Sequence, residues 1–412
     1  MRLATFTILA FAAALTVQAQ IGWVKIGPDT PDRVFYSVWM IDLEHAVVVG
    51  DSGLIRLTTD GGTNWRTIPT GTQARLTRVR FTTPRLGYVS GSDGVLLKTT
   101  DGGNSWSSIN TKQTGVIYDV IFFDEANGLI GGYAGLCKST TDSGRTWTNR
   151  DIGFGPNNVY SFTFLNNKKG WACGNAGNVA RTTNGGTSWQ GQNSGKGTSL
   201  YSISFGSDSS GTMCSTGGLI LHTTNGGKNW FVQYADVPIS TYSLNEVQHL
   251  DGDRAYIVGY YGLVLLTTNG GKNWTPQDTP IQDFLEGMHF IDPKNGYAVG
   301  WKGAIVKTRT GGFLDADPAR EAAVFSLSKL YPNPASSTSG NLVSIEFNLT
   351  RPGDVTASVW SPLGQQVDHI ASGRYDAGTW NVRWQPRSLA PGTYYVRLQT
   401  ASGVAVRSVV LR

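Results

Sequence analysis

One eight-residue string recurs through the chain at a nearly constant interval. It reads Thr-Thr-Asp-Gly-Gly-Thr-Asn-Trp at 58–65, and related copies end at Trp106, Trp147, Trp189, Trp230 and Trp274. Successive tryptophans lie 41, 41, 42, 41 and 44 residues apart, and a seventh copy at 308–313 lacks the tryptophan. Self-similarity at this period predicts one supersecondary unit that packs repeatedly against copies of itself.

Each unit has the pattern of four short strands. In the second unit these are 76–81, 87–90, 95–100 and 106–109, with a Gly-x-x-Gly hairpin at 91–94. Glycine supplies the positive φ that such tight hairpins require. A charged fraction of only 15% and 52 glycines also favour strands and turns over long helices. A repeated four-stranded unit of about 40–45 residues is a propeller blade.

The N-terminal strand is expected to close the ring. Trp23-Val-Lys-Ile26 matches Trp65-Arg-Thr-Ile68, so Trp23 supplies the tryptophan that the seventh copy lacks. Closure removes the exposed sheet edges that promote aggregation. The predicted fold class is therefore all-β, with a seven-bladed β-propeller over residues 20–313.

The first 19 residues have the pattern of a Sec signal peptide. Arg2 precedes an apolar stretch, and Val17-Gln18-Ala19 places small residues before a cleavage site. An uncleaved membrane anchor is the alternative, but the apolar run is short for a span. No other stretch approaches spanning length. The net charge is +5 and the basic residues form no run, which argues against a nucleic-acid partner.

The C-terminal part has a different pattern. Residues 314–325 are expected to form a linker. Residues 326–412 are expected to form a small immunoglobulin-like β-sandwich, because short alternating strands are separated by Gly and Pro turns. The strands are predicted at 343–349, 355–359, 380–384, 394–398 and 404–411.

The acidic or amide residue of each repeated string is assigned a structural role. Its side-chain oxygen is expected to accept hydrogen bonds within its own turn. Asn184, Asn225 and Asn269 replace Asp, and an amide is a poor ligand for a hard cation. No metal or cofactor site is therefore expected at the six positions Asp60, Asp101, Asp142, Asn184, Asn225 and Asn269.

The repeated string resembles the Asp-box, also called the bacterial neuraminidase repeat. Together with Gly87-Tyr-Val-Ser-Gly and Gly296-Tyr-Ala-Val-Gly, it is similar to the photosystem II assembly and stability factor family. The resemblance implies a seven-bladed propeller. The family's role in photosystem assembly is not expected here, since two export signals direct this chain out of the cell.

The C-terminal motifs resemble the type A sorting domain of the type IX secretion system. They are Tyr331-Pro-Asn-Pro334, Leu363-Gly-Gln365 and Gly392-Thr-Tyr-Tyr-Val-Arg-Leu398. The resemblance implies that the secretion machinery of a Bacteroidota-type bacterium is a partner of residues 326–412. It also implies removal of the domain, with release of the protein or attachment to the cell surface. An ordinary adhesive sandwich domain is the alternative.

A glycan-cleaving enzyme is the alternative function, because Asp-boxes also occur in sialidases. Glycosidases need two carboxyl groups across a cleft. Asp119, Glu246 and Glu286 fall on predicted inner strands. We expect them to be solvated residues of the central channel, and no other catalytic apparatus is visible.

The favoured function is a secreted, non-enzymatic propeller that binds a protein or a glycan. The Gly-x-x-Gly hairpins and the blade-to-blade loops are expected on the face opposite the Asp-boxes. Aromatic residues at hairpin tips that the fold does not require are binding candidates. They are Tyr133, Tyr260, Tyr261 and Trp301, with Lys302 and Arg78 as polar partners. Packing of these rings on neighbouring loops is the alternative.

Overall fold

A computed structural model describes residues 22–27, 30, 32–235, 242–312, 325–333, 335, 342–349, 352–361, 366–386, 389–400 and 403–412. The chain divides into two compact units, Met1–Asp315 and Ala316–Arg412. The predicted signal peptide lies outside the described residues, as does nearly all of the predicted linker. Phe325, which the prediction assigned to the linker, instead begins strand β29.

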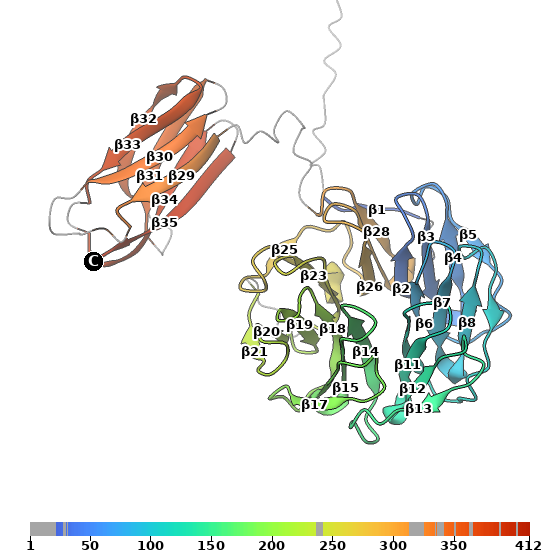
Figure 1. The fold of residues 1–412 in the computed structure, drawn as a ribbon. Helices are drawn as coiled ribbons and strands as arrows, with labels where there is room; N and C mark the ends of the chain where they lie inside the picture. The colour runs from blue at the N-terminus through green and yellow to red at the C-terminus, as the bar shows by residue number, and fades with distance from the viewer. Residues whose placement is uncertain are drawn as a thin grey trace, which may run out of the picture. The chain divides into compact units, whose positions relative to one another are not determined.

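Seven four-stranded antiparallel sheets form a ring in the first unit (Figure 1). The innermost strands are β2 (Phe35–Met40), β6 (Leu76–Phe81), β10 (Ile117–Phe122), β14 (Val159–Phe164), β18 (Leu200–Phe205), β22 (Leu244–His249) and β26 (Leu285–Phe290). The second strands are β3 (Ala46–Gly50), β7 (Gly87–Gly91), β11 (Gly128–Gly132), β15 (Gly170–Gly174), β19 (Gly211–Ser215), β23 (Ala255–Gly259) and β27 (Gly296–Gly300).

The outer half of each blade completes the sheet. The third strands are β4 (Ile55–Thr58), β8 (Leu96–Thr99), β12 (Cys137–Thr140), β16 (Asn178–Thr182), β20 (Ile220–Thr223), β24 (Val264–Thr267) and β28 (Ile305–Thr308). The outermost strands are β5 (Arg66–Ile68), β9 (Ser107–Ser108), β13 (Thr148–Asn149), β17 (Gln190–Asn193), β21 (Phe231–Gln233), β25 (Thr275–Gln277) and β1 (Val24–Lys25).

The ring closes as the sequence predicts. Strand β1 pairs with β28, so the N-terminal strand is the outermost strand of the seventh blade. Trp23 is fully buried, and its ring meets that of Phe290 edge to face at 5.6 Å. Trp106 with Phe81 and Trp147 with Phe122 have the same edge-to-face geometry within their own blades. The seven-bladed propeller is confirmed.

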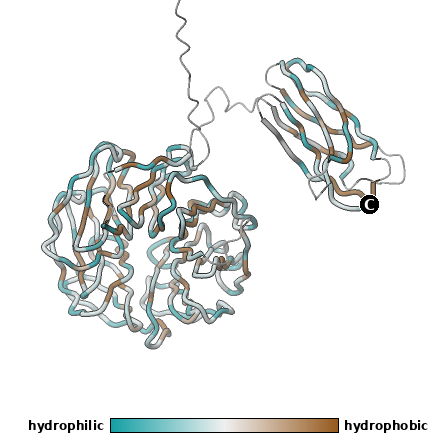
Figure 2. The backbone as a smooth tube through the Cα atoms, turned by 180° about the vertical axis from the view of Figure 1, so that it is seen from behind, coloured by the Kyte–Doolittle hydropathy of each residue, from teal (hydrophilic) through white to brown (hydrophobic). Residues whose placement is uncertain are grey.

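The hydrophobic core lies between neighbouring blades. Val47, Val49 and Leu57 of the first blade pack against Val79 and Val89 of the second. The hydrophobic stretches follow the strands, whereas many of the loops are hydrophilic (Figure 2). Cys137, Cys173 and Cys214 are buried free thiols within this packing.

Short 3-10 turns connect the second and third strands in six blades. They are η1 (Asp51–Gly53), η2 (Ser92–Gly94), η3 (Tyr133–Gly135), η4 (Asn175–Gly177), η5 (Tyr260–Gly262) and η6 (Trp301–Gly303). In η1, η2, η5 and η6 the amide of the third residue donates to a carbonyl of the following blade-to-blade loop, as Gly53 does to Ala74 and Gly262 to Asp283. These hairpins and loops therefore share one face of the ring, which we call the hairpin face.

The second unit consists of two antiparallel sheets around a common core. One contains β29 (Phe325–Tyr331), β30 (Val343–Leu349) and β33 (Gly378–Trp384). The other contains β31 (Gly353–Trp360), β32 (Gln366–Tyr375), β34 (Gly392–Thr400) and β35 (Gly403–Leu411). Val343, Phe347, Val359 and Val396 are buried between the sheets. Strands β29 and β32 were not predicted from the sequence.

Candidate functional site

A β-bulge recurs at the start of every inner strand. In each blade the register shifts between the first and third residues of the strand, so that the second residue is left over. Bulges redirect a side chain away from its alternating position. The seven bulged residues are Tyr36, Thr77, Tyr118, Tyr160, Tyr201, Asn245 and Glu286.

These bulged side chains line a depression at the mouth of the central channel on the hairpin face. The depression has a volume of about 390 Å³ and is also lined by Arg75, Arg78, Ser243 and Tyr260. We call it the tyrosine bowl. Tyr118, Tyr160 and Tyr201 follow one another along its wall in edge-to-face contacts of 5.0 and 5.7 Å between ring centroids. The three rings belong to the inner strands β10, β14 and β18.

Most of the phenols in the bowl are partly buried. Burial raises the pKa of Tyr36, Tyr118 and Tyr201 above the ordinary value, so these hydroxyls stay protonated near neutral pH. A phenolic hydroxyl both donates and accepts a hydrogen bond. The bowl therefore presents flat apolar rings together with hydroxyl groups that can both donate and accept hydrogen bonds.

One positively charged and one negatively charged side chain line the bowl. The guanidinium of Arg75 lies 5.4 Å from the centroid of the Tyr36 ring. The carboxylate of Glu286 accepts a hydrogen bond of 2.6 Å from Nε1 of Trp301. Burial raises the pKa of Glu286, while the hydrogen bond from Trp301 and the charge of Arg75 oppose that rise.

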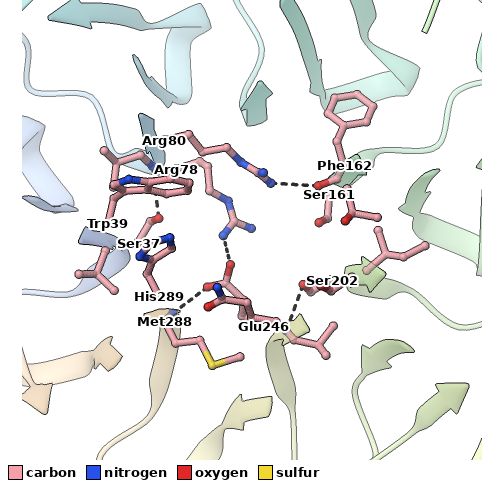
Figure 3. A pocket seen from close by; sticks show the side chains of 17 residues that line it. Ser37, Trp39, Arg78, Arg80, Ser161, Phe162, Ser202, Glu246, Met288 and His289 are labelled. Atoms are coloured by element: carbon pink, nitrogen blue, oxygen red, sulfur yellow. Dashed lines mark hydrogen bonds and ion pairs between the residues drawn. The ribbon is translucent and has the colours of Figure 1, made fainter. Parts of the chain in front are cut away.

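Charged side chains project into the channel beneath the bowl, where Figure 3 shows Arg78 meeting Glu246. Arg78 forms an ion pair with Glu246 and lies 3.6 Å from Asp119. Arg80 binds Asp119 through two hydrogen bonds, at 3.0 and 2.8 Å. The Asp119 side chain is fully buried and also accepts backbone N–H groups from Val120 and Phe162. A cavity of about 160 Å³ lies among these residues.

This network corrects two expectations. Asp119 and Glu246 are not solvated, because arginine side chains from the second blade pair with both. Burial alone would lower the pKa of Arg78, but the charges of Glu246 and Asp119 raise it. Arg78, expected as a polar partner of the aromatic residues, does line the bowl, but its charge is already compensated by Glu246 and Asp119.

Three of the four predicted aromatic residues come together on the hairpin face. The ring of Phe284 stacks on Tyr260 at 4.0 Å and lies 5.3 Å from Tyr261 and 5.2 Å from Trp301. With Tyr242, which is 5.1 Å from Tyr261, these residues form what we call the aromatic wall. Tyr261 is 55% exposed and Trp301 is 43% exposed, so packing among loops leaves half of each ring free.

The other predicted contact residues lie outside the wall. Tyr133 is 59% exposed on the third blade, where its ring covers Gly115. Lys302 pairs with Asp283 at 2.8 Å on the seventh blade's hairpin. The structure therefore groups Tyr260, Tyr261 and Trp301 beside the bowl and leaves Tyr133 separate.

Sequence reasoning missed the tyrosine bowl. A signal was present, since Tyr36, Tyr118, Tyr160 and Tyr201 each stand 24 residues before the Asp or Asn of their own Asp-box. In a regular strand, successive side chains point to opposite faces of the sheet, so this side chain would not face the mouth of the channel. It does so because of the bulge, and no sequence pattern indicates the bulge.

The Asp-boxes form hydrogen bonds within their own turns on the opposite face. A carboxylate oxygen of Asp60 accepts the backbone N–H of Asn64 at 2.8 Å, and the amide oxygen of Asn184 accepts that of Ser188 at 3.0 Å. The same bond joins Asp101 to Ser105, Asp142 to Thr146, Asn225 to Asn229 and Asn269 to Asn273. No metal-binding group of three or more His, Cys, Asp or Glu occurs among the described residues.

The family model described as Photosynthesis system II assembly factor YCF48 matches residues 15–114, 109–196 and 187–278. The chain belongs to this family. A second model, the Secretion system C-terminal sorting domain, matches residues 329–412. Both resemblances seen in the sequence are thus confirmed. No curated protein matches the chain significantly.

Solved structures support the same fold. A structure titled "YCF48 bound to D1 peptide" is 21% identical, with a TM-score of 0.59, over 71% of this chain and 95% of that one. YCF48 from Cyanidioschyzon merolae is 20% identical, with a TM-score of 0.58, over 70% and 98%. The WD40 propeller domain of Doa1 is 12% identical, with a TM-score of 0.58, over 70% and 97%. Within the described ranges, no helix is long and apolar enough to cross a membrane.

Proposed function

We propose that this protein is an exported, non-enzymatic propeller that binds a protein segment or a glycan on its hairpin face. The observation that carries the proposal is the tyrosine bowl, flanked by the half-exposed rings of Tyr261 and Trp301. Concave sites lined by aromatic side chains with a few polar groups are the usual form of a ligand site.

Export is the second part of the proposal. Residues 1–19 direct the chain to the periplasm, and residues 326–412 direct it through the type IX machinery to the cell surface or the medium. The sorting-domain match at 329–412 supports the second step. A role in photosystem assembly is not carried over from the family, because a surface protein does not meet that assembly.

A binding role is supported by the nature of the relatives. One similar structure carries a bound peptide in its title, and others are WD40 propellers. Catalysis by the channel carboxylates is disfavoured, since Asp119 and Glu246 are held by Arg80 and Arg78. Of the residues that line the bowl, only Glu286 is a carboxylate, whereas a glycosidase needs two.

The test compares two multiple variants of the full mature chain. Tyr261→Ala with Trp301→Ala removes exposed rings, so the melting temperature is expected to change little. Aromatic residues at interfaces commonly contribute about 2 kcal/mol or more, so binding should fall at least about 30-fold. Asp60→Ala with Asp101→Ala removes turn acceptors on the other face. That variant should melt earlier and bind normally, as read by glycan array and by interferometry with surface proteins.

The reverse pattern would place the binding surface on the Asp-box face. Loss of binding in the Asp-box variant at unchanged melting temperature, with full binding in the aromatic variant, contradicts the proposal.

A further inference from the structure

The backbone edges that face the channel are occupied by side chains of the neighbouring blade. Oγ1 of Thr77 donates to the carbonyl of Ile117 at 2.7 Å, and Nδ2 of Asn245 donates to that of Leu285 at 2.8 Å. Lower in the channel, Oε2 of Glu246 accepts the Met288 N–H at 2.8 Å.

The same arrangement recurs around the ring. Oγ of Ser37 accepts the Val79 N–H, Oγ of Ser202 accepts the Val247 N–H, and Nδ1 of His289 accepts the Met40 N–H. A peptide that binds by adding a strand needs free N–H and C=O groups along an edge. Because these backbone groups already have hydrogen-bond partners, strand addition is disfavoured at the bowl. Ligand recognition there therefore depends on side chains.

The charges at the bowl are balanced. Arg78 is compensated by Glu246 and Asp119 below it. Arg75 and Glu286 then remain as one positive and one negative group in the lining of the depression, and the carboxylate of Asp51 acts on Tyr36 from outside this lining. A site for an anionic or a cationic ligand is expected to carry an excess of the opposite charge. The lining of the bowl carries none, which favours a neutral ligand.

The remaining lining groups match a polyhydroxylated ring. The edge-to-face series of Tyr118, Tyr160 and Tyr201 offers ring faces and edges for stacking. Phenolic hydroxyls and the Ser243 hydroxyl donate and accept, and Arg75 and Glu286 add a strong donor and a strong acceptor. The volume of about 390 Å³ lies at the small end of ligand sites, and the ion pair of Arg78 with Glu246 lies beneath it, so a chain is expected to enter by its end.

We propose that the tyrosine bowl binds the end of a neutral oligosaccharide, with its terminal sugar units held among Tyr118, Tyr160, Tyr201 and Glu286. This inference rests on the proposed function and names the ligand class for it. The aromatic wall then contacts the sugars that extend out of the mouth.

The experiment titrates the full mature chain by calorimetry. The probes are the neutral oligosaccharides maltotetraose, cellotetraose, chitotetraose and mannotetraose, with the anionic sialyllactose and an acidic hexapeptide for comparison. We expect at least one neutral probe to bind, and raising the salt concentration to leave its affinity unchanged, because no net charge is paired.

The matched variants separate the bowl from the rest of the face. Tyr160→Ala with Tyr201→Ala should weaken the neutral probe by at least about tenfold. Tyr133→Ala, which removes an exposed tyrosine outside the bowl, should leave the affinity unchanged. Glu286→Gln retains an acceptor and should weaken a neutral sugar by less than about tenfold, whereas a cationic ligand would lose most of its binding. Circular dichroism and melting temperature check that each variant is folded.

Each contrary result has a definite meaning. If the peptide or sialyllactose binds in a salt-sensitive way, and this binding is lost in the Tyr160 and Tyr201 variant, the ligand of the bowl is not a neutral glycan. The proposed binding function is unaffected by that result. Neutral-sugar binding that survives this variant and is lost with Tyr261→Ala and Trp301→Ala moves the glycan out of the bowl and overturns the inference. Failure of every neutral probe to bind also overturns it. The proposed function itself falls only if the surface-protein and glycan-array screens also find no ligand on this face.

Discussion

At the scale of single residues, Tyr261 has an unusual backbone. It occupies the second position of η5 with φ 59°, in the left-handed region that bulky residues seldom adopt. The equivalent positions elsewhere hold small or flexible residues, such as Ser52, Ala134 and Ala176. The left-handed φ therefore belongs to this type of hairpin, and Tyr261 is the one aromatic residue that adopts it in the six 3-10 turns.

Two substitutions separate the backbone of Tyr261 from its ring. Tyr261→Ala and Tyr261→Gly both remove the contacts with Phe284 and Tyr242, but only glycine adopts this φ without strain. We expect the glycine variant to be more stable than the alanine variant by about 1 kcal/mol in urea unfolding. Both should lose ligand affinity equally. Equal stability of the two variants would show that the position is not strained.

Two histidines, the buried His249 and the partly buried His289, make the ring sensitive to acid. Nε2 of His249 lies 2.8 Å from Oγ1 of Thr212, and Nδ1 of His289 accepts the Met40 N–H. Burial lowers the pKa of His249 to about 4 and that of His289 to about 3. A lowered folded-state pKa means that the unfolded chain binds more protons, so stability falls as the pH falls.

The pH window follows from these values. The contribution of both histidines to the free energy of unfolding is complete above the pKa of about 6.5 that histidine has in the unfolded chain. This contribution is lost progressively toward pH 4 and below. Urea midpoints measured between pH 7 and about 4.5 should therefore decline. His249→Gln should make that decline shallower, since glutamine does not titrate. A midpoint that stays constant over this window would contradict the burial of neutral imidazoles.

At the scale of elements, the blades could be predicted from the sequence more completely than the candidate site. The constant spacing of Trp65, Trp106 and Trp147 was enough to predict four strands per unit, and the match of Trp23 predicted the closing strand. Strand β32 was missed because many of its residues are exposed, so it lacks clear apolar alternation. The pairing of Arg78 with Glu246 spans 168 residues and four blades, so no local pattern indicates it.

The closing strand allows a direct test. Although β1 has only two residues, Trp23 is fully buried against Phe290. Trp23→Ala should cost about 3–5 kcal/mol of unfolding free energy, as for other buried aromatic residues. Val24→Ala, at a half-exposed position in the same strand, should change it by less than about 0.5 kcal/mol. If thermal unfolding showed the same loss in both variants, Trp23 would not hold the ring closed.

At the scale of the whole molecule, folding and export are assigned to different units. All seven blades lie in Met1–Asp315, and the sorting-domain match lies in Ala316–Arg412. The closing pair β1 and β28 also lies within the first unit. The propeller is therefore expected to fold without the C-terminal unit.

A stop codon after Asp315 separates the two roles in the native host. The truncated chain keeps its proposed signal peptide and all its blades, so it should reach the periplasm and melt at nearly the temperature of the propeller in the full chain. Without the sorting unit it should remain there, whereas the full chain appears on the surface or in the medium. Cell fractionation with an antibody to the propeller measures the distribution. Truncated protein in the medium of intact cells would mean that export does not depend on the C-terminal unit, and that this sandwich serves adhesion instead.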